Sequence, residues 1–175
     1  MPQSVSKYNS LARFMHWLSA LAIFSLFALG YWMVNLSYYS EWYKIAPNWH
    51  KSVGLSLFAL TLLRLIWKTL SKAPDIEGQN WEKTGAKIAH ILLYILLFST
   101  FISGYLISTA DGRGIEIFSL FTLPSLGELI ANQEDLAGEV HFYLTYSLIA
   151  LALLHALAAL KHHFINKDNT LKKML

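Results

Sequence analysis

The side chains best suited to chemistry in this 175-residue chain are its seven histidines, because the sequence contains no cysteine. The lack of Cys excludes disulfides, thiolate zinc sites, iron–sulfur clusters and thioether-linked haem. An imidazole nitrogen can still bind a metal or carry a proton near neutral pH. The histidines are His16, His50, His90, His141, His155, His162 and His163.

Two of them share one predicted helix, and their spacing indicates how they are used. His141 and His155 are fourteen residues apart. At about 3.6 residues per turn, this spacing returns to within about 40° of the same face, about 21 Å along the axis. Each imidazole then needs a partner at its own depth, and His50 matches the depth of His141. His16 and His90 both match the depth of His155, and spacing alone does not choose between them.

Paired histidines from facing helices suit a metal that a macrocycle already carries, since bare zinc or copper usually takes three or four converging ligands. Haem needs only two axial ligands from the protein, and bis-histidine ligation favours electron transfer over oxygen binding. Gly54, Gly104 and Gly138 would let a flat porphyrin approach a helix, although close helix packing explains such glycines equally well. The competing hypothesis is a haem-free protein that uses its histidines for interhelical hydrogen bonds or proton transfer.

The elements that position these histidines are predicted to be transmembrane helices. Hydrophobic residues make up 55% of the chain and charged residues 14%, compared with roughly 45–50% and about 25% in soluble proteins. Charge-poor stretches long enough to cross a bilayer predict helices at about 12–36, 48–70, 86–110 and 138–164. The predicted fold class is an all-α membrane protein, a single domain over residues 1–175 built as a four-helix transmembrane bundle. The first stretch is too long for a signal-peptide core and is expected to be a retained helix.

Basic residues predict how the bundle is oriented. The terminal segments, the loop 71–83 and the helix ends beside that loop together hold eleven of the fourteen Lys and Arg residues, which places both termini in the cytoplasm by the positive-inside rule. The net charge of +3 then reflects topology and attraction to anionic lipid, with no nucleic-acid partner expected. The opposite side has seven acidic against three basic residues. Its Lys51 and Arg113 are candidate contacts for haem propionates or another anion.

The outer connection, residues 111–139, is longer than most loops that lack secondary structure. We expect Phe118, Leu120 and Phe121 to lie in the membrane interface, and residues 126–137 to form a short helix that covers the bundle. The connection would then be a lid or a docking surface. A simple interfacial connector is the alternative.

Several short motifs are distributed from the first helix to the C-terminal segment. They are His16-Trp17, His50-Lys51-Ser52-Val53-Gly54, Ala89-His90, Leu160-Lys161-His162-His163-Phe164 and Lys167-Asp168-Asn169-Thr170-Leu171. Together they resemble the bacterial cytochrome b561 family over essentially the whole chain, and the stretch 102–112 looks closer to a second branch than to the best-studied one. The resemblance implies an inner-membrane bundle with two b-type haems, with His16 paired with His155 and His50 with His141 as axial ligands of haem iron. It also implies ubiquinone near the inner end of the fourth helix, where His162 matches.

These points predict a di-haem cytochrome that carries electrons across the inner membrane between a periplasmic reactant and the ubiquinone pool. Electrons would pass from the His50/His141 haem to the His16/His155 haem. The best-studied branch that the chain resembles oxidises superoxide, which makes superoxide a candidate donor and the chain a superoxide oxidase-like enzyme. The acidic outer side opposes capture of an anion and favours a basic periplasmic protein partner. In that case the chain would be an electron-carrier subunit without a small-molecule substrate of its own.

Overall fold

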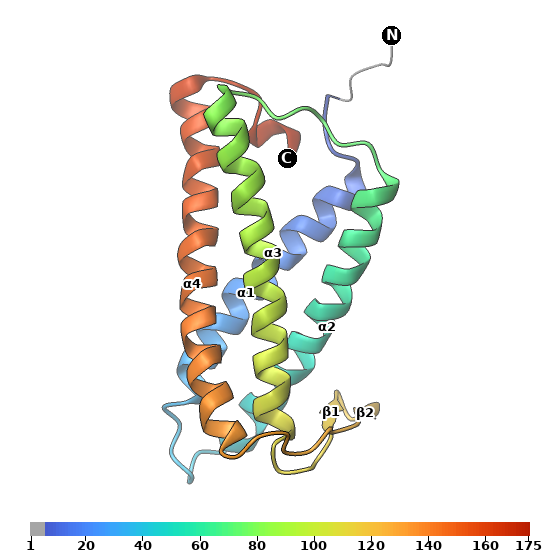
Figure 1. Ribbon diagram of the computed structural model, residues 1–175, viewed down its shortest axis with the longest axis vertical. Coiled ribbons are helices and arrows are strands. Elements are labelled where there is room, and N and C mark those ends of the chain that lie inside the picture. Colours follow the sequence, from blue (N-terminus) through green and yellow to red (C-terminus); the bar gives the residue numbers. More distant parts are fainter. Residues whose placement is uncertain (1–5) are drawn as a thin grey trace.

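Four long helices dominate the computed structural model, which describes residues 6–175. They are α1 (Ser10–Met33), α2 (Trp42–Leu70), α3 (Asn80–Thr109) and α4 (Gln133–Lys161). Each is long and apolar enough to cross a membrane, which confirms the predicted all-α transmembrane bundle. The start of α1 and the C-terminal segment lie at one end of the bundle, here called the termini end (Figure 1).

Three helices begin before the apolar stretches that predict them. α2 begins at Trp42, α3 at Asn80 and α4 at Gln133, whereas hydropathy alone places these starts about five or six residues later. The reason is that lipid contact needs apolar residues, while a helix start needs polar partners for its free N–H groups. At the start of α3, Glu82 Oε2 accepts the backbone N–H of Gln79 at 2.8 Å, as in a capping box.

The outer connection forms a β-hairpin where the sequence suggested only loop and helix. β1 (Ile115–Ile117) pairs antiparallel with β2 (Phe121–Leu123), at the end of the bundle opposite the chain termini (Figure 1). We call this the β-hairpin end. The expected separate helix over 126–137 is wrong, because only residues 133–137 are helical and they belong to α4. Gly127 and Asn132 both have positive φ, 73° and 57°, which interrupts a right-handed helix there.

The bundle is built from two helical hairpins that touch each other sparingly. α1 packs closely along α2, and α3 along α4, whereas α2 meets α3 and α1 meets α4 over much shorter stretches. A small core of Leu57, Leu97 and Leu148 joins the hairpins. Leu148 lies seven residues from both His141 and His155, so this core separates the two levels at which those histidines stand. The two hairpins are therefore joined mainly at this core, along a boundary here called the seam.

The C-terminal segment folds back across the termini end of the bundle. Trp17 Nε1 donates to the Met174 carbonyl at 2.8 Å, and Lys173 Nζ lies 2.6 Å from Glu77 Oε1. Glu77 also accepts the Asn169 N–H at 3.0 Å. These contacts join α1, the loop before α3 and the end of the chain into one surface.

Candidate functional site

At the β-hairpin end, His50 of α2 and His141 of α4 face each other across the seam. Their ring centroids are 6.4 Å apart and the ring planes are inclined by 72°. Each ring lies against a glycine of a neighbouring helix, His50 against Gly30 of α1 and His141 against Gly104 of α3. A Cβ atom on Gly30 would stand 3.2 Å from His50 Cε1, and one on Gly104 would stand 3.2 Å from His141 Cε1. A larger residue at either place would press on the imidazole, because the ring approaches the helix backbone so closely.

The orientation of His141 is fixed by its hydrogen bonds. Its Nδ1 lies 3.1 Å from the Thr100 carbonyl oxygen and 3.0 Å from Ser103 Oγ. A carbonyl can only accept, so Nδ1 carries the proton and donates to Thr100. That tautomer leaves Nε2 with a free lone pair, which is how metal-binding imidazoles are usually prepared. His50 Nδ1, in contrast, is buried without a hydrogen-bond partner among residues 6–175.

At the termini end, three histidines from three helices come together. His16 of α1 and His155 of α4 have ring centroids 6.3 Å apart, with planes inclined by 68°. His90 of α3 is closer still, with its centroid 5.2 Å from that of His155. Both candidates that spacing left open therefore adjoin His155. Arg64 Nη2 donates to His16 Nδ1 at 2.8 Å.

The separations within the pairs suit a metal between two imidazoles. Two metal–nitrogen bonds of about 2 Å, plus about 1 Å from each nitrogen to its ring centre, place the centroids about 6 Å apart. The 6.3 Å of His16 and His155 and the 6.4 Å of His50 and His141 agree with this, while the 5.2 Å between His90 and His155 is too short. Although His16, His90 and His155 come together, no group of three or more side chains within residues 6–175 is placed to hold a bare metal ion.

Open space adjoins the pair at the β-hairpin end. A Cβ atom on Gly54 or on Gly138 would meet nothing within 4 Å. These glycines lie one helical turn from His50 and His141, on similar faces. The residues therefore fit a flat group bound through two imidazoles, with glycine backbone along its edge.

His162 is held in a separate polar cluster at the termini end. It opens the π-helical turn His162–Asn166 that continues α4, and its side chain is only 12% exposed. Its Nδ1 lies 2.5 Å from Asp168 Oδ2, and its Nε2 lies 3.9 Å from Glu82 Oε1. Lys161 Nζ donates to the same Glu82 oxygen at 2.6 Å. Burial raises the pKa of Asp168, but hydrogen bonds from His162 and Thr170 outweigh it and lower the pKa overall.

Sequence comparison relates nearly the whole chain to known proteins. The sequence profile of the prokaryotic cytochrome b561 family matches residues 7–175. The chain belongs to the prokaryotic cytochrome b561 family.

Two relatives from Escherichia coli strain K12 and one from Yersinia pestis illustrate the range of similarity. Cytochrome b561 homolog 2 of E. coli is 44% identical over 171 residues, which cover 97% of this chain and 91% of that protein. Cytochrome b561 homolog 1 is 26% identical, with 98% of both chains covered. The probable superoxide oxidase CybB of Y. pestis is 27% identical, with 97% and 96% covered. This chain is therefore a multi-pass bacterial membrane protein of a family that carries b-type haem and transfers electrons.

The two cations that the sequence suggested as haem-propionate contacts, Lys51 and Arg113, differ in whether a carboxylate already binds them. Arg113 is engaged with Asp111, with Nη2 2.5 Å from Oδ2, and its side chain is 86% exposed. The Arg113 side chain holds the pKa of Asp111 below its usual range. Lys51 makes no hydrogen bond or ion pair within the described residues. Of the two, Lys51 is the cation without a carboxylate partner.

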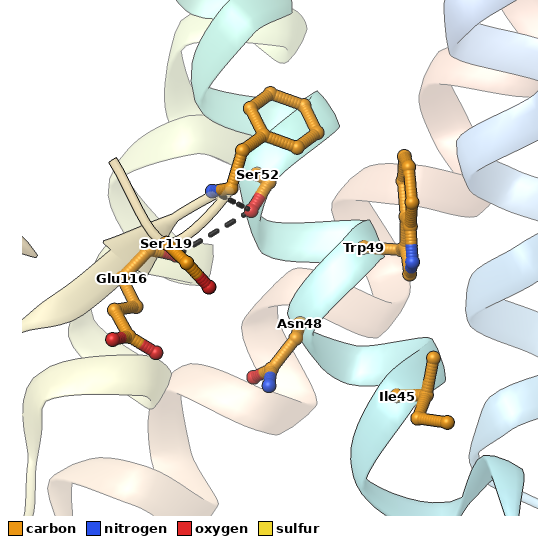
Figure 2. Close-up of a pocket in the computed structure, with 7 residues that line it drawn as sticks. Ile45, Asn48, Trp49, Ser52, Glu116 and Ser119 are labelled. Carbon is orange, nitrogen blue, oxygen red and sulfur yellow. Dashed lines mark hydrogen bonds between the residues drawn. The ribbon is translucent and has the colours of Figure 1, made fainter. Parts of the chain in front are cut away.

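A cavity of about 370 Å³ lies between α2 and the β-hairpin, and Figure 2 shows its lining. Ser52 Oγ anchors the hairpin there by accepting the Phe118 N–H at 3.1 Å. Ile45, Trp49 and Ser52 recur at helical spacing along one face of α2. His50 lies about 100° around the helix from Trp49 and further from Ser52. The cavity is therefore on the opposite face of α2 from the histidine pair.

Several residues around the pairs escaped the sequence reasoning. Gly30, Thr100 and Ser103 support the imidazoles, and Arg64 contacts one of them. The signal available for Arg64 was a charge within an apolar helix, which was interpreted as reaching for the headgroups. The others carry no sequence signal because they contribute backbone or a small side chain.

Proposed function

We propose that this member of the family binds two b-type haems, with His50 and His141 as axial ligands of one and His16 and His155 of the other. It would carry electrons across the bacterial inner membrane between a periplasmic reactant and ubiquinone. The observation that carries the proposal is the pair of nearly equal ring separations, 6.3 and 6.4 Å, across the loosely packed seam. When bound, each bis-histidine haem supplies a one-electron carrier without an open coordination position.

The chain's own residues prepare and separate the two sites. The Thr100 carbonyl holds the His141 ring with Nε2 free, and Gly104 gives the ring room to reach that carbonyl. The Leu57, Leu97 and Leu148 core keeps water out of the middle of the bundle between the two levels. Electron transfer along the seam needs no movement of these groups.

Quinone chemistry is proposed for the termini end, which the positive-inside rule places in the cytoplasm. Reduction of a quinone consumes protons as well as electrons. His162 would supply them near the membrane surface, and its carboxylate neighbours Glu82 and Asp168 would hold the protonated imidazole in place. This assigns the quinone site to the vicinity of His162.

Two donors are considered at the β-hairpin end. Superoxide is suggested by the similarity to the probable superoxide oxidase of Y. pestis, and Lys51 with Arg113 would form its positive entrance. A second candidate function, electron exchange with a basic periplasmic protein, is favoured by the engagement of Arg113 with Asp111 and by the excess of acids on that side. The exposed Leu120 and Phe121 of the hairpin would contact that partner or the bilayer surface.

The first experiment is a dithionite-reduced minus oxidised optical spectrum of the purified protein, with haem counted per chain. We expect two haems in the wild type, one in His141→Ala and one in His16→Ala. His90→Ala is the matched control, because it removes a histidine next to His155 and should leave both haems. A colourless wild type, or a His90→Ala protein that loses a haem while His16→Ala keeps both, would refute the assignment.

The donor is then tested by stopped-flow mixing of the oxidised protein with superoxide and, separately, by co-purification from membranes. Rapid haem reduction by superoxide supports the enzyme. An unreactive protein that co-purifies with a basic periplasmic protein supports the carrier. Re-oxidation of the reduced protein by ubiquinone, slowed in His162→Ala, tests the quinone site.

A further inference from the structure

Two cations in the last two turns of α2 have no carboxylate partner within the described residues. Arg64 and Lys68 lie one turn apart on α2, and neither forms an ion pair with Asp or Glu within residues 6–175. Both face the Tyr94 ring of α3, at 6.0 and 5.4 Å from its centroid. Arg64 is partly buried within this apolar helix, where a charge is costly and normally has a partner or a function. The aromatic ring offsets only part of that cost.

The contact between Arg64 and His16 cannot persist if His16 binds a metal through Nε2. Arg64 Nη2 donates to His16 Nδ1 at 2.8 Å, so in this state Nδ1 has no proton and Nε2 carries it. An imidazole that binds metal through Nε2 has its proton on Nδ1, where it would face the guanidinium as a second donor. Arg64 must then turn to another acceptor, and no carboxylate of residues 6–175 forms an ion pair with it.

We infer that Arg64 and Lys68 form a carboxylate-binding site for the propionate groups of the haem at the termini end. This rests on the proposed function, because it presupposes a haem between His16 and His155. A b-type haem brings two propionate carboxylates, and this site presents two cations at the level of that histidine pair. Arginine can bind a carboxylate with two parallel hydrogen bonds, and lysine adds a point charge.

The site would also give the two haems different reduction potentials. No Lys or Arg side chain hydrogen-bonds to His50 or His141 within the described residues, whereas Arg64 reaches His16. Positive charge favours the reduced form of a haem, because reduction adds an electron. Arg64 and Lys68 therefore raise the reduction potential of the haem at the termini end, which draws electrons away from the β-hairpin end.

The test is a potentiometric titration of the purified two-haem protein, followed optically and resolved into two one-electron components. Arg64→Gln and Lys68→Gln each remove a charge, and Arg64→Lys keeps it. Lys72→Gln is the matched control, because Lys72 is exposed and lies one turn beyond Lys68, outside α2. Each protein is titrated in lipid-free detergent and in nanodiscs that contain phosphatidylglycerol, since a lipid phosphate is the other anion these cations would bind.

We expect Arg64→Gln to lower the equilibrium constant for reduction of one component about tenfold, which is about 59 mV for one electron. Lys68→Gln should lower the same component by less, and the second component should not move. Arg64→Lys should restore most of the shift, and Lys72→Gln should leave both components unchanged.

Two outcomes would overturn the inference. A shift seen only with phosphatidylglycerol would assign the site to a lipid phosphate. Two unchanged components in both charge-removing variants would mean that the cations bind no propionate. If Arg64→Gln fails to fold, Lys68→Gln decides alone, since it leaves the contact to His16 in place. A wild type with fewer than two haems contradicts the proposed function itself, whereas two haems with potentials insensitive to Arg64 and Lys68 contradict only this inference.

Discussion

Replacing Gly54 by alanine should raise the stability of the apoprotein and lower its affinity for haem. Alanine is favoured over glycine in a helix interior by about 0.5–1 kcal/mol. The added methyl meets no atom within 4 Å in the structure, so the apoprotein should gain about that much stability. With a porphyrin edge against α2, the same methyl would be overpacked, which typically costs about 1–3 kcal/mol.

The expected loss in affinity for the haem at the β-hairpin end is therefore about 5- to 150-fold. Gly138→Ala tests the facing side, because Gly138 also has nothing within 4 Å. Gly85→Ala is the matched control. Its position in α3 is equally open, but it lies about 140° around the helix from His90, so it should stabilise the apoprotein without affecting haem.

The assay has two parts for each variant. Unfolding of the apoprotein in detergent, followed by tryptophan fluorescence, gives the change in stability. Titration of the apoprotein with haem, followed by the bis-histidine optical band, gives two binding steps. The reasoning is refuted if Gly54→Ala and Gly138→Ala keep wild-type affinity in both steps. It is also refuted if Gly85→Ala weakens haem binding as much as they do.

Three further predictions concern polar side chains. Ser103→Ala removes one neighbour of His141 Nδ1 but leaves a carbonyl acceptor, so haem binding should weaken by at most about tenfold, or about 0.5–1.5 kcal/mol, in the same titration. The lowered pKa of Asp168 means that its contacts stabilise the C-terminal segment above the ordinary Asp pKa of about 3.9 and are lost as pH falls through the lower folded value. Hydrogen exchange of that segment, corrected for its intrinsic pH dependence, should rise below about pH 4, and Asp168→Asn should remove this transition. Ser52→Ala should speed exchange of the Phe118 N–H without altering the haem spectrum, and a spectral change would contradict the placement of that cavity away from His50.

The sequence predicted the parts of the fold that depend on periodicity and hydropathy. Four charge-poor stretches became four helices, and a spacing of fourteen residues correctly set two levels on α4. His50 and His141, matched only by depth, have ring centroids 6.4 Å apart. Their role as ligands stays a prediction, but their proximity follows from helical geometry alone.

The parts that were not predictable depend on contacts between distant residues. His16 and His90 both lie near His155, and only the ring separations distinguish them. The β-hairpin was missed because its strands have three residues each, too few to show alternation. Every residue has a backbone carbonyl, so the sequence could not predict that the Thr100 carbonyl orients His141.

The sparse contact between the two helical hairpins gives this chain its most general property. Each hairpin is closely packed on its own, and the seam is closed by a few leucines midway along it. Every histidine pair bridges this seam, with one member on α4 and the other on α1 or α2. A group bound by both members would join the hairpins where packing does not, so binding would stabilise the folded bundle by mass action. The same arrangement places one level beside Arg64 and Lys68 and the other beside an acidic surface. If both pairs bind haem as proposed, this difference in charge between the two levels would favour electron flow toward the termini end.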